Sequence, residues 1–277
     1  MVPDRGLSTS KQSGVKAMKV RLTYAFTTNA DGSDKLQPFV IGKAARPQAF
    51  QKKFGAQLGF YYRHNAKAWM TAQLYQDWIK QWDQELKAKN RKILLLQDNF
   101  SGHIVPPDLE AIHIENFRPN LTAHIQPNDQ GIIRCFKAHY RARFIQQAIN
   151  RYDEGVTPAE IYDINQLQAM RMAEAAWRDV DTTAIWNCWH NAQILPEIPT
   201  SSPAIQPSIP ISSLLHNNPS SLQIDPLAHA EKQVENAFDD LQSRGVLHRD
   251  NRLDIESLLS PQTEAHIMAE ASDKDIY

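Results

Sequence analysis

Two aspartates stand where secondary structure would hold their side chains in place. Asp98 follows the apolar run Ile93–Leu96, and Asp129 opens a long amphipathic segment, with 30 residues between them. Phosphoryl transfer by two metal ions needs carboxylates that converge on ions about 3.5–4 Å apart. Hard oxygen ligands match Mg²⁺, and a strand end beside a helix start fixes such ligands well. The pair therefore predicts a metal site for phosphoryl transfer. Such a site needs a third acid, and none is evident.

Each acid also has an ordinary structural interpretation. Asp98 alone fits a solvated acid at a strand end, and Asp129 alone fits an acid that stabilises a helix N-terminus. For His103, a polar structural role is at least as good an interpretation as catalysis. The other histidines and the two cysteines show no metal-binding spacing, and the chain has no glycine-rich phosphate loop.

The segments before Asp98 predict a mixed α/β fold. Residues 18–27 and 36–41 predict two strands of a hairpin, joined at the Asp31-Gly32 step, and Pro38 predicts an edge position for the second strand. Residues 58–63 predict a third extended piece. An apolar stripe with a residue at every fourth position predicts a helix over 71–89 with Thr71 as its N-cap; the stripe is Met70, Leu74, Trp78, Trp82 and Leu86. The uniformly apolar 93–96 segment predicts a strand buried on both faces, and 111–114 a short strand. We expect the hairpin to lie beside the strand at 93–97.

The segment from Asp129 predicts a helix over 129–150. Arg134, Lys137 and Arg141 fall within about 60° on one face of it, with Arg143 nearby. These four side chains predict phosphate contacts, which are non-specific and salt-sensitive. The alternative is that they form the solvated face of a core helix. Two further helices are expected, one through Leu167–Trp177 and one from Thr182 or Thr183 to Trp189.

Charge divides the chain into two unlike halves. Residues 1–150 hold 22 Lys and Arg against 11 Asp and Glu, whereas residues 151–277 hold 8 against 20. A basic body followed by an acidic tail predicts a domain that faces a polyanion, although ordinary solvated surfaces are the alternative. No run approaches the ~18 apolar residues of a membrane span.

The last third of the chain has a different composition. Residues 196–226 contain seven prolines and seven serines, which predicts an extended linker. Asp225 and Pro226 then provide an N-cap and a first-turn proline for a helix that Gly245 should stop.

Several stretches resemble the DDE-type transposases of the pogo/Tigger group, which includes relatives domesticated as centromere-protein-B-like DNA-binding proteins. The resemblance covers roughly residues 1–195. It is carried by Asp98-Asn99-Phe100-Ser101-Gly102-His103, Gln126-Pro127-Asn128-Asp129-Gln130-Gly131, the Thr28–Gly32 hairpin turn, Ile41-Gly42-Lys43, Ala68–Thr71 and Trp186–Trp189. By this resemblance, Asp98 and Asp129 correspond to the second and third catalytic acids, and both would be metal ligands.

The resemblance departs from the family at the N-terminus. In the family, the first catalytic Asp lies in an Asp-Glu-Thr motif on the first strand, just upstream of a segment that resembles Val2–Gly6. We therefore expect that strand and that acid to be absent, along with the N-terminal helix-turn-helix region. Asp4, Asp31 and Asp34 are weak substitutes, because Asp4 precedes the first strand and the other two fit a turn. Two acids are too few to hold two metals.

The resemblance and the composition together give one set of expectations. The fold class is α/β, with an RNase H-like mixed sheet that lacks its first strand, flanking helices and an acidic helical tail. The domains are an incomplete DDE domain over 1–195, a Pro/Ser-rich linker over 196–225 and the tail over 226–277. An intact relative would use Mg²⁺ or Mn²⁺ to cleave and transfer DNA strands, whereas this chain would be inactive.

Two alternatives remain open at this point. One is a domesticated, non-catalytic nuclear protein that associates with DNA or with other proteins. The other is a gene model that starts at an internal Met, with a complete enzyme encoded upstream. The expected partner is DNA in the nucleus, with no membrane. A homo-oligomer and contacts of the acidic tail with other proteins are open.

Overall fold

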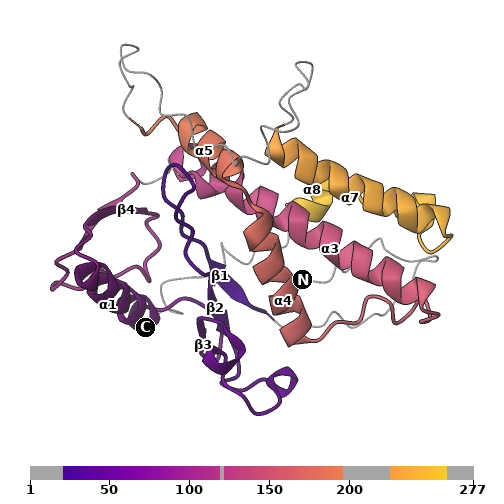
Figure 1. Cartoon of the computed structure of the whole chain (residues 1–277), viewed down its shortest axis with the longest axis horizontal. Helices are drawn as coiled ribbons and strands as arrows, with labels where there is room; N and C mark the ends of the chain where they lie inside the picture. The colour runs from indigo at the N-terminus through magenta and orange to yellow at the C-terminus, as the bar shows by residue number, and fades with distance from the viewer. Residues whose placement is uncertain (1–20, 119–121, 196–224, 261–277) are drawn as a thin grey trace. The chain divides into compact units, whose positions relative to one another are not determined.

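The computed structural model describes residues 21–118, 122–195 and 225–260 (Figure 1). The chain divides into two compact units. The first, here called the α/β unit, contains Arg21–Phe26 and Gln37–Asp129. The second, called the helical unit, contains Thr27–Leu36 and Gln130–Ser260. A mixed α/β fold with small sheets and several helices agrees with the sequence prediction. No helix of the described residues is long and apolar enough to cross a membrane.

The α/β unit contains two separate sheets. In the first, β1 (Thr23–Ala25) pairs antiparallel with β2 (Phe39–Gly42), and β2 pairs parallel with β3 (Tyr62–His64). In the second, β4 (Ile93–Gln97) pairs parallel with β5 (Ile112–Asn116). The antiparallel hairpin and the strands at 93–97 and 112–116 confirm the sequence prediction, although β1 is much shorter than the predicted strand, whose residues 18–20 lie outside the described residues.

Three predictions about these strands were wrong. The 93–96 segment was expected to be buried on both faces, but Leu94 is 58% exposed and the other three side chains are only half-buried. The hairpin was expected beside the 93–97 strand, but its strands and β4 belong to different sheets. Pro38 was expected to place the second strand at an edge, but β2 lies between β1 and β3. Pro38 precedes the first residue of β2, so its missing N–H removes no hydrogen bond from the ladder.

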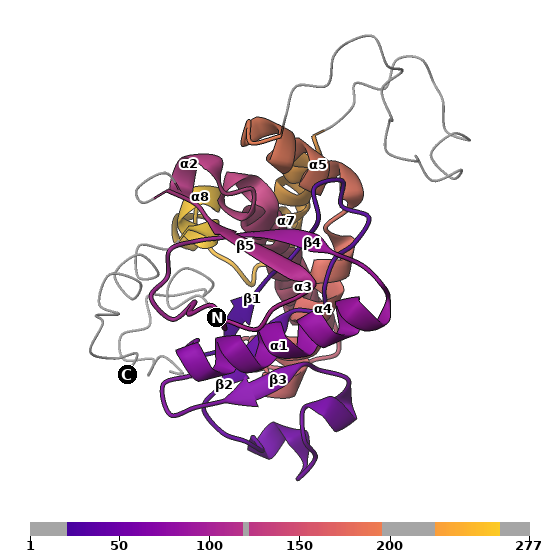
Figure 2. The same cartoon turned by 90° about the vertical axis from the view of Figure 1, so that its left-hand side faces the viewer.

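Helix α1 (Ala72–Ala88) packs against strands of both sheets (Figure 2). Its N-cap is Thr71, whose hydroxyl accepts a hydrogen bond from Leu74 N, as predicted. The fully buried apolar stripe is Tyr75, Ile79 and Leu86, together with Phe39, Ile41 and Ile112 from the strands. Leu74, Trp78 and Trp82 of the predicted stripe are only partly buried, so the helix is rotated from the predicted orientation.

Asp83 of α1 is a buried carboxylate, with 4% of its surface exposed. Its Oδ1 accepts hydrogen bonds from the backbone N–H groups of Glu110, Ala111 and Ile112 at 2.8–3.1 Å. These bonds hold the start of β5 against the helix, and so fix the register in which β5 meets β4.

Short elements connect the longer ones in this unit. They are two 3₁₀ turns in the β2–β3 connection (Gln48–Phe50 and Ala56–Leu58), the four-residue helix α2 (Thr122–Ile125), and a π-type turn (Asn128–Ile132) whose last residues belong to the helical unit. The π-type turn contains Gly131 at φ 151°, which breaks the helical path. The predicted helix 129–150 therefore begins at Ile133 rather than at Asp129.

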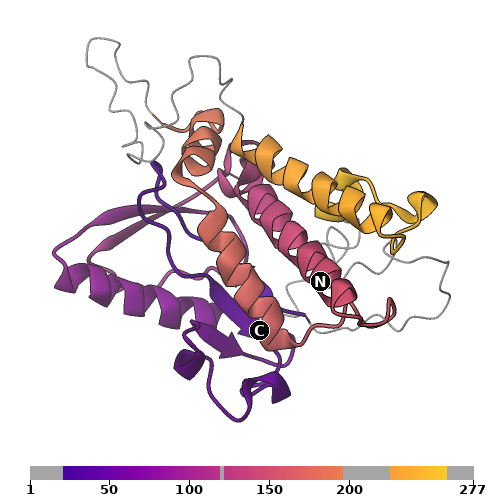
Figure 3. The ribbon, with the colours of Figure 1, turned by 45° about the vertical axis from the view of Figure 1, so that its right-hand side comes forward.

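The helical unit is built around α3 (Ile133–Asp153), with α4 (Gln166–Asp179) and α7 (Pro226–Ser243) alongside it (Figure 3). The shorter α5 (Thr182–Asn191) and α8 (Ile255–Leu259) complete the unit, with a 3₁₀ turn at Arg249–Asn251. Polar caps set several boundaries: Asn165 forms a capping box before α4, and Asp181 caps α5. Asp225 and Pro226 begin α7 as predicted.

The ends of the tail fall partly outside the described residues. Helix α7 ends at Ser243, two residues before Gly245, whose φ of 72° suits glycine. The stop predicted at Gly245 is therefore confirmed. Residues 196–224, which make up nearly all of the predicted linker, and residues 261–277 of the predicted tail lie outside the described residues.

Candidate functional site

A buried polar network fixes the carboxyl end of β4. The last residue of that strand is Gln97, and its side chain accepts a hydrogen bond from Tyr75 Oη and donates one to Asn116 Oδ1 at 2.8 Å. The backbone continues the ladder, since Phe117 N donates to Gln97 O at 2.8 Å. Burial raises the pKa of Tyr75, so its hydroxyl stays a neutral donor. The backbone at the end of β4 is therefore held rigidly where the next residue follows Gln97.

Asp98 is that residue, and its carboxylate is held from two sides. Its Oδ1 lies 2.8 Å from His103 Nδ1 and accepts a hydrogen bond from Phe100 N at 3.2 Å. Burial alone would raise the pKa of Asp98, but the His103 contact and the Phe100 N–H together hold it below its ordinary value. The side chain remains 36% exposed. Asp98 is thus an ionised carboxylate with solvent access at the end of a strand.

His103 is fixed by aromatic neighbours. Its ring centre lies 4.7 Å from that of Tyr75 and 5.3 Å from that of Phe100. The turn closes through a hydrogen bond from His103 N to Phe100 O at 2.9 Å. Gly102 has no room for a side chain, because the Phe100 ring lies where a Cβ would be. This geometry supports a role for His103 in positioning Asp98.

Asp129 belongs to the same unit as Asp98, and it is exposed. It lies in the π-type turn, where its N–H donates to Gln126 O at 3.0 Å. The neighbouring Asn128 donates to Phe26 O at 3.2 Å, which ties the turn to the end of β1. Asp129 therefore stands on an ordered turn four residues before the first residue of α3.

The described residues do not form a two-metal centre by themselves. Among residues 21–118, 122–195 and 225–260, no three His, Cys, Asp or Glu side chains are arranged to hold a metal ion. Of the possible substitutes for a missing acid, Asp31 lies in a turn of the helical unit, where it accepts hydrogen bonds from Ser33 N and Ser33 Oγ at 2.9 and 2.7 Å. Asp34 belongs to the same turn, and Asp4 lies outside the described residues.

Of the four cations on α3 that are predicted to contact DNA, two contact acidic side chains and two are at least partly buried. Arg134 donates to Glu231 of α7 at 2.5 Å and to Glu256 of α8 at 2.6 Å. Arg143 donates from Nε to Asp179, at the end of α4, at 2.9 Å. Arg141 is 7% exposed, and Lys137 is half-buried. The structure therefore does not bring these residues together as an open basic rim, because acidic groups of the helical unit compete with phosphate for two of them.

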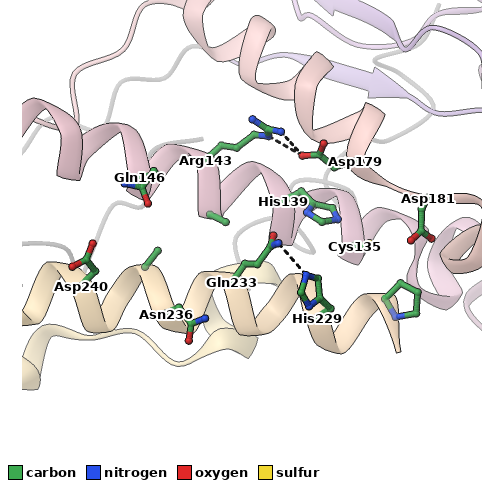
Figure 4. A pocket seen from close by; sticks show the side chains of 13 residues that line it. Cys135, His139, Arg143, Gln146, Asp179, Asp181, His229, Gln233, Asn236 and Asp240 are labelled. Carbon is green, nitrogen blue, oxygen red and sulfur yellow. Dashed lines mark hydrogen bonds and ion pairs between the residues drawn. The ribbon is translucent and has the colours of Figure 1, made fainter. Parts of the chain in front are cut away.

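A polar pocket of about 800 Å³ lies between α3 and α7 (Figure 4). Arg143 and Asp179 form an ion pair on its wall, and His229 and Gln233 share a hydrogen bond at 3.2 Å. Burial lowers the pKa of His139, which also lines it. With an acid beside its arginine and an imidazole whose charged form is disfavoured, this pocket does not select an anion such as phosphate.

Known proteins resemble this chain over about two thirds of its length. The family model described as DDE superfamily endonuclease matches residues 19–189. The chain belongs to this family. The DDE domain is 29% identical over 177 residues to the mouse Tigger transposable element-derived protein 4, with 64% of this chain aligned. It is 29% identical to CENP-B homolog protein 2 of Schizosaccharomyces pombe and 31% identical to the human major centromere autoantigen B, over 68% and 62% of this chain.

The chain spans only part of these relatives. The alignments cover 33%, 38% and 27% of the three relatives' own lengths. No solved structure gives a significant match to the chain.

Several residues that organise this site were not identified from the sequence. Tyr75 lies one position away from the predicted helix stripe, and Asn116 lies beyond the predicted end of its strand. The one available signal was Gln97, a polar residue between an apolar run and Asp98. A polar side chain in a buried strand needs partners, and Tyr75 and Asn116 provide them.

Proposed function

We propose that this chain is a transposase-derived DDE domain that binds DNA and does not cleave it by itself. In this proposal Asp98 and Asp129 occupy the positions of the second and third catalytic acids of the family. The observation that carries the proposal is the ionised Asp98 carboxylate at the carboxyl end of β4, within the segment that matches the DDE family model. The finer fold assignment is an RNase H-like mixed sheet.

The two separate sheets support that assignment. Strands β2 and β5 both contribute side chains to the core under α1, although they belong to different sheets. A two-stranded parallel sheet such as β4–β5 is unusual on its own, because parallel sheets are normally larger and covered on both faces. A central strand between β1 and β4 would join the two sheets into one mixed sheet.

The absence of cleavage follows from the number of acids. Relatives with an intact site would hold Mg²⁺ or Mn²⁺, which stabilises charge as a DNA strand is cut. Mg²⁺ gives up its water ligands reluctantly, so two aspartates compete poorly with water for it. Asp98 would still favour a bound cation electrostatically.

The domain plan and the location are part of the same proposal. We assign residues 1–195 to the DDE domain, 196–225 to a linker and 226–277 to an acidic tail. We expect the protein in the nucleus, with DNA as its partner. The contribution of Arg134, Lys137, Arg141 and Arg143 to DNA binding stays a prediction, since phosphate would first have to displace the acids that Arg134 and Arg143 now contact.

A second candidate function is that of a domesticated, non-catalytic DNA-associated protein. The names of several relatives favour it, since they include a centromere autoantigen and the ARS-binding protein 1 of Schizosaccharomyces pombe. Both candidate functions include contact with DNA. They differ in whether a longer form of the protein still cleaves and transfers DNA strands.

Salt dependence of DNA affinity tests the proposal. The full chain would be titrated into a fluorescent 30-bp duplex at increasing NaCl concentrations. We expect the logarithm of the association constant to fall linearly with the logarithm of salt concentration, because each phosphate contact releases counterions with a slope of about −0.9. An affinity that does not change between low and physiological salt would contradict DNA-backbone binding.

A further inference from the structure

The connection between β2 and β3 carries a concentrated positive charge. From Lys35 to Gln76 the sequence has seven Lys and Arg residues and no Asp or Glu over 42 residues. Four of these cations lie in residues 43–54 of the β2–β3 connection, here called the β2–β3 loop. All four are exposed: Lys43, Arg46, Lys52 and Lys53. Figure 2 shows this connection projecting beyond β2 and β3.

These four cations differ from those on α3 in their partners. Within the part of the chain that the structure describes, none of the four forms an ion pair with a carboxylate, whereas Arg134 and Arg143 are both paired. A cation that binds phosphate from solution does not first have to break an internal ion pair. The loop therefore offers phosphate a better surface than α3 does.

The loop is held in one shape by Tyr62 of β3. The Tyr62 hydroxyl donates to Ala44 O at 2.8 Å, and the Phe50 ring packs edge-on against the Tyr62 ring with centres 5.2 Å apart. Gly42 and Gly55 lie so close to Tyr62 that neither position has room for a side chain. The base of the loop is therefore anchored to the sheet at both ends.

Internal contacts also order the tip of the loop. Backbone hydrogen bonds run from Gln51 N to Gln48 O at 3.1 Å and from Lys53 N to Phe50 O at 3.0 Å. Gln51 and Lys52 both adopt left-handed backbone conformations, with φ of 50° and 67°, which non-glycine residues rarely do. Such strain persists only where surrounding contacts fix the conformation, and an ordered loop loses less entropy when it binds.

Arg46 is positioned by an aromatic ring. The guanidinium carbon of Arg46 lies 3.8 Å from the centre of the Phe54 ring. Phe54 itself is 48% exposed. Phe54 N in turn donates to Gln57 Oε1 at 2.8 Å. A cation–π contact restricts the guanidinium plane while leaving its N–H donors open, and these donors match phosphate oxygens.

We propose that the β2–β3 loop binds the sugar–phosphate backbone of duplex DNA through Lys43, Arg46, Lys52 and Lys53. This inference rests on the proposed DNA-binding function, and it assigns that function to a surface distinct from the acids and from α3. The contacts are to phosphate, so they carry no sequence preference and weaken with salt.

The test compares two variants of the full chain that lose the same charge. The loop variant carries Lys43→Gln, Arg46→Gln, Lys52→Gln and Lys53→Gln. The control variant carries Lys80→Gln, Lys89→Gln, Lys92→Gln and Arg178→Gln, which are also three lysines and one arginine at exposed positions. Far-UV circular dichroism and urea unfolding establish that both variants fold like the wild type.

The expected result is a selective loss of affinity for the 30-bp duplex. The loop variant should bind roughly 30- to 100-fold more weakly at 100 mM salt, and its salt slope should be smaller in magnitude by about 3. The control variant should stay within roughly threefold of the wild type. Equal losses in both variants would overturn the proposal, because net charge and not the loop would then be responsible.

Failure of this inference differs from failure of the proposed function. If the wild type and the loop variant bind the duplex equally and with the same salt slope, the loop is not the contact surface, although the chain still binds DNA. If the wild type shows no salt-dependent binding, both are wrong.

A second comparison tests Phe54 as a positioning residue. Phe54→Leu removes the ring under Arg46 and should weaken binding by roughly threefold, whereas Phe54→Tyr keeps the ring and should restore wild-type affinity. Binding that is unchanged in Phe54→Leu, or lost equally in both variants, would show that the ring does not position Arg46.

Discussion

At the residue scale, one buried carboxylate fixes the start of β5 in the α/β unit. Asp83 was not distinguishable in the sequence, where it looks like a solvated acid on an amphipathic helix. In the structure it is buried and accepts three backbone hydrogen bonds from the start of β5. Periodicity in the sequence shows which face of a helix is apolar. It does not show which polar side chain of the helix accepts hydrogen bonds from the backbone N–H groups of a neighbouring strand.

Asp83→Ala should therefore destabilise the fold strongly. The change leaves three buried N–H groups without an acceptor, and hydrogen bonds to a charged group contribute about 1.5–3 kcal/mol each, so we expect a loss of roughly 3–5 kcal/mol. Asp83→Asn keeps one acceptor oxygen and should lose less. Urea unfolding followed by tryptophan fluorescence measures both, and a loss below about 1 kcal/mol for Asp83→Ala would contradict this role.

The two cysteines give a pH-dependent prediction for the helical unit. Burial raises the pKa of Cys135 to about 12 and that of Cys188 to about 11, both from an ordinary 9.0. A raised pKa in the folded state means that stability is retained below pH 9 and is lost as the pH rises from about 9 towards 11. We expect the urea midpoint to fall over that window, and to fall less in Cys135→Ser/Cys188→Ser.

Thiol labelling provides an independent measurement of the same burial. At pH 8 a chromogenic disulfide reagent should label neither thiol until urea unfolds the chain, because the thiolate is the reactive form. Rapid labelling of the native protein would show that these side chains are accessible.

At the element scale, residues 226–260, the described part of the predicted tail, belong to the helical unit. Helix α7 packs along α3, and Glu231 and Glu256 both reach Arg134 from α7 and α8. The caps at Asp225 and Gly245 could be predicted because capping depends on local sequence. The face on which the helix docks could not, because that depends on pairing between residues about 100 positions apart.

A double-mutant cycle measures this docking. Since Arg134 and Glu231 are partly buried, we expect a coupling energy of about 1 kcal/mol for that pair. The coupling with Glu256 should be smaller because Glu256 is more exposed. Urea unfolding of Arg134→Gln, Glu231→Gln and the double variant gives the first value. A coupling near zero would mean that apolar packing alone holds α7 on α3.

At the scale of the whole molecule, the charge asymmetry of the chain has a structural basis. The acid-poor stretch includes the exposed β2–β3 loop of the α/β unit, while acids of the second half pair with α3 inside the helical unit. Composition predicted a polyanion-facing body, and the spacing of Arg and Lys on α3 predicted the contact surface. In the sequence, a helical face of Arg and Lys looks the same whether it meets solvent or a carboxylate. The position of Asp98 could be predicted from the sequence, because it depends only on where one strand ends.

Plasmid nicking tests the central claim, that this DDE domain binds DNA without cleaving it. Supercoiled plasmid would be incubated with the full chain and Mn²⁺ at low salt, then run on agarose before and after removal of protein. We predict retarded mobility before deproteinisation and fully supercoiled plasmid after it. Open circles that form with the wild type and disappear with Asp98→Asn would contradict the claim, and would show that Asp98 works with an acid outside the described residues.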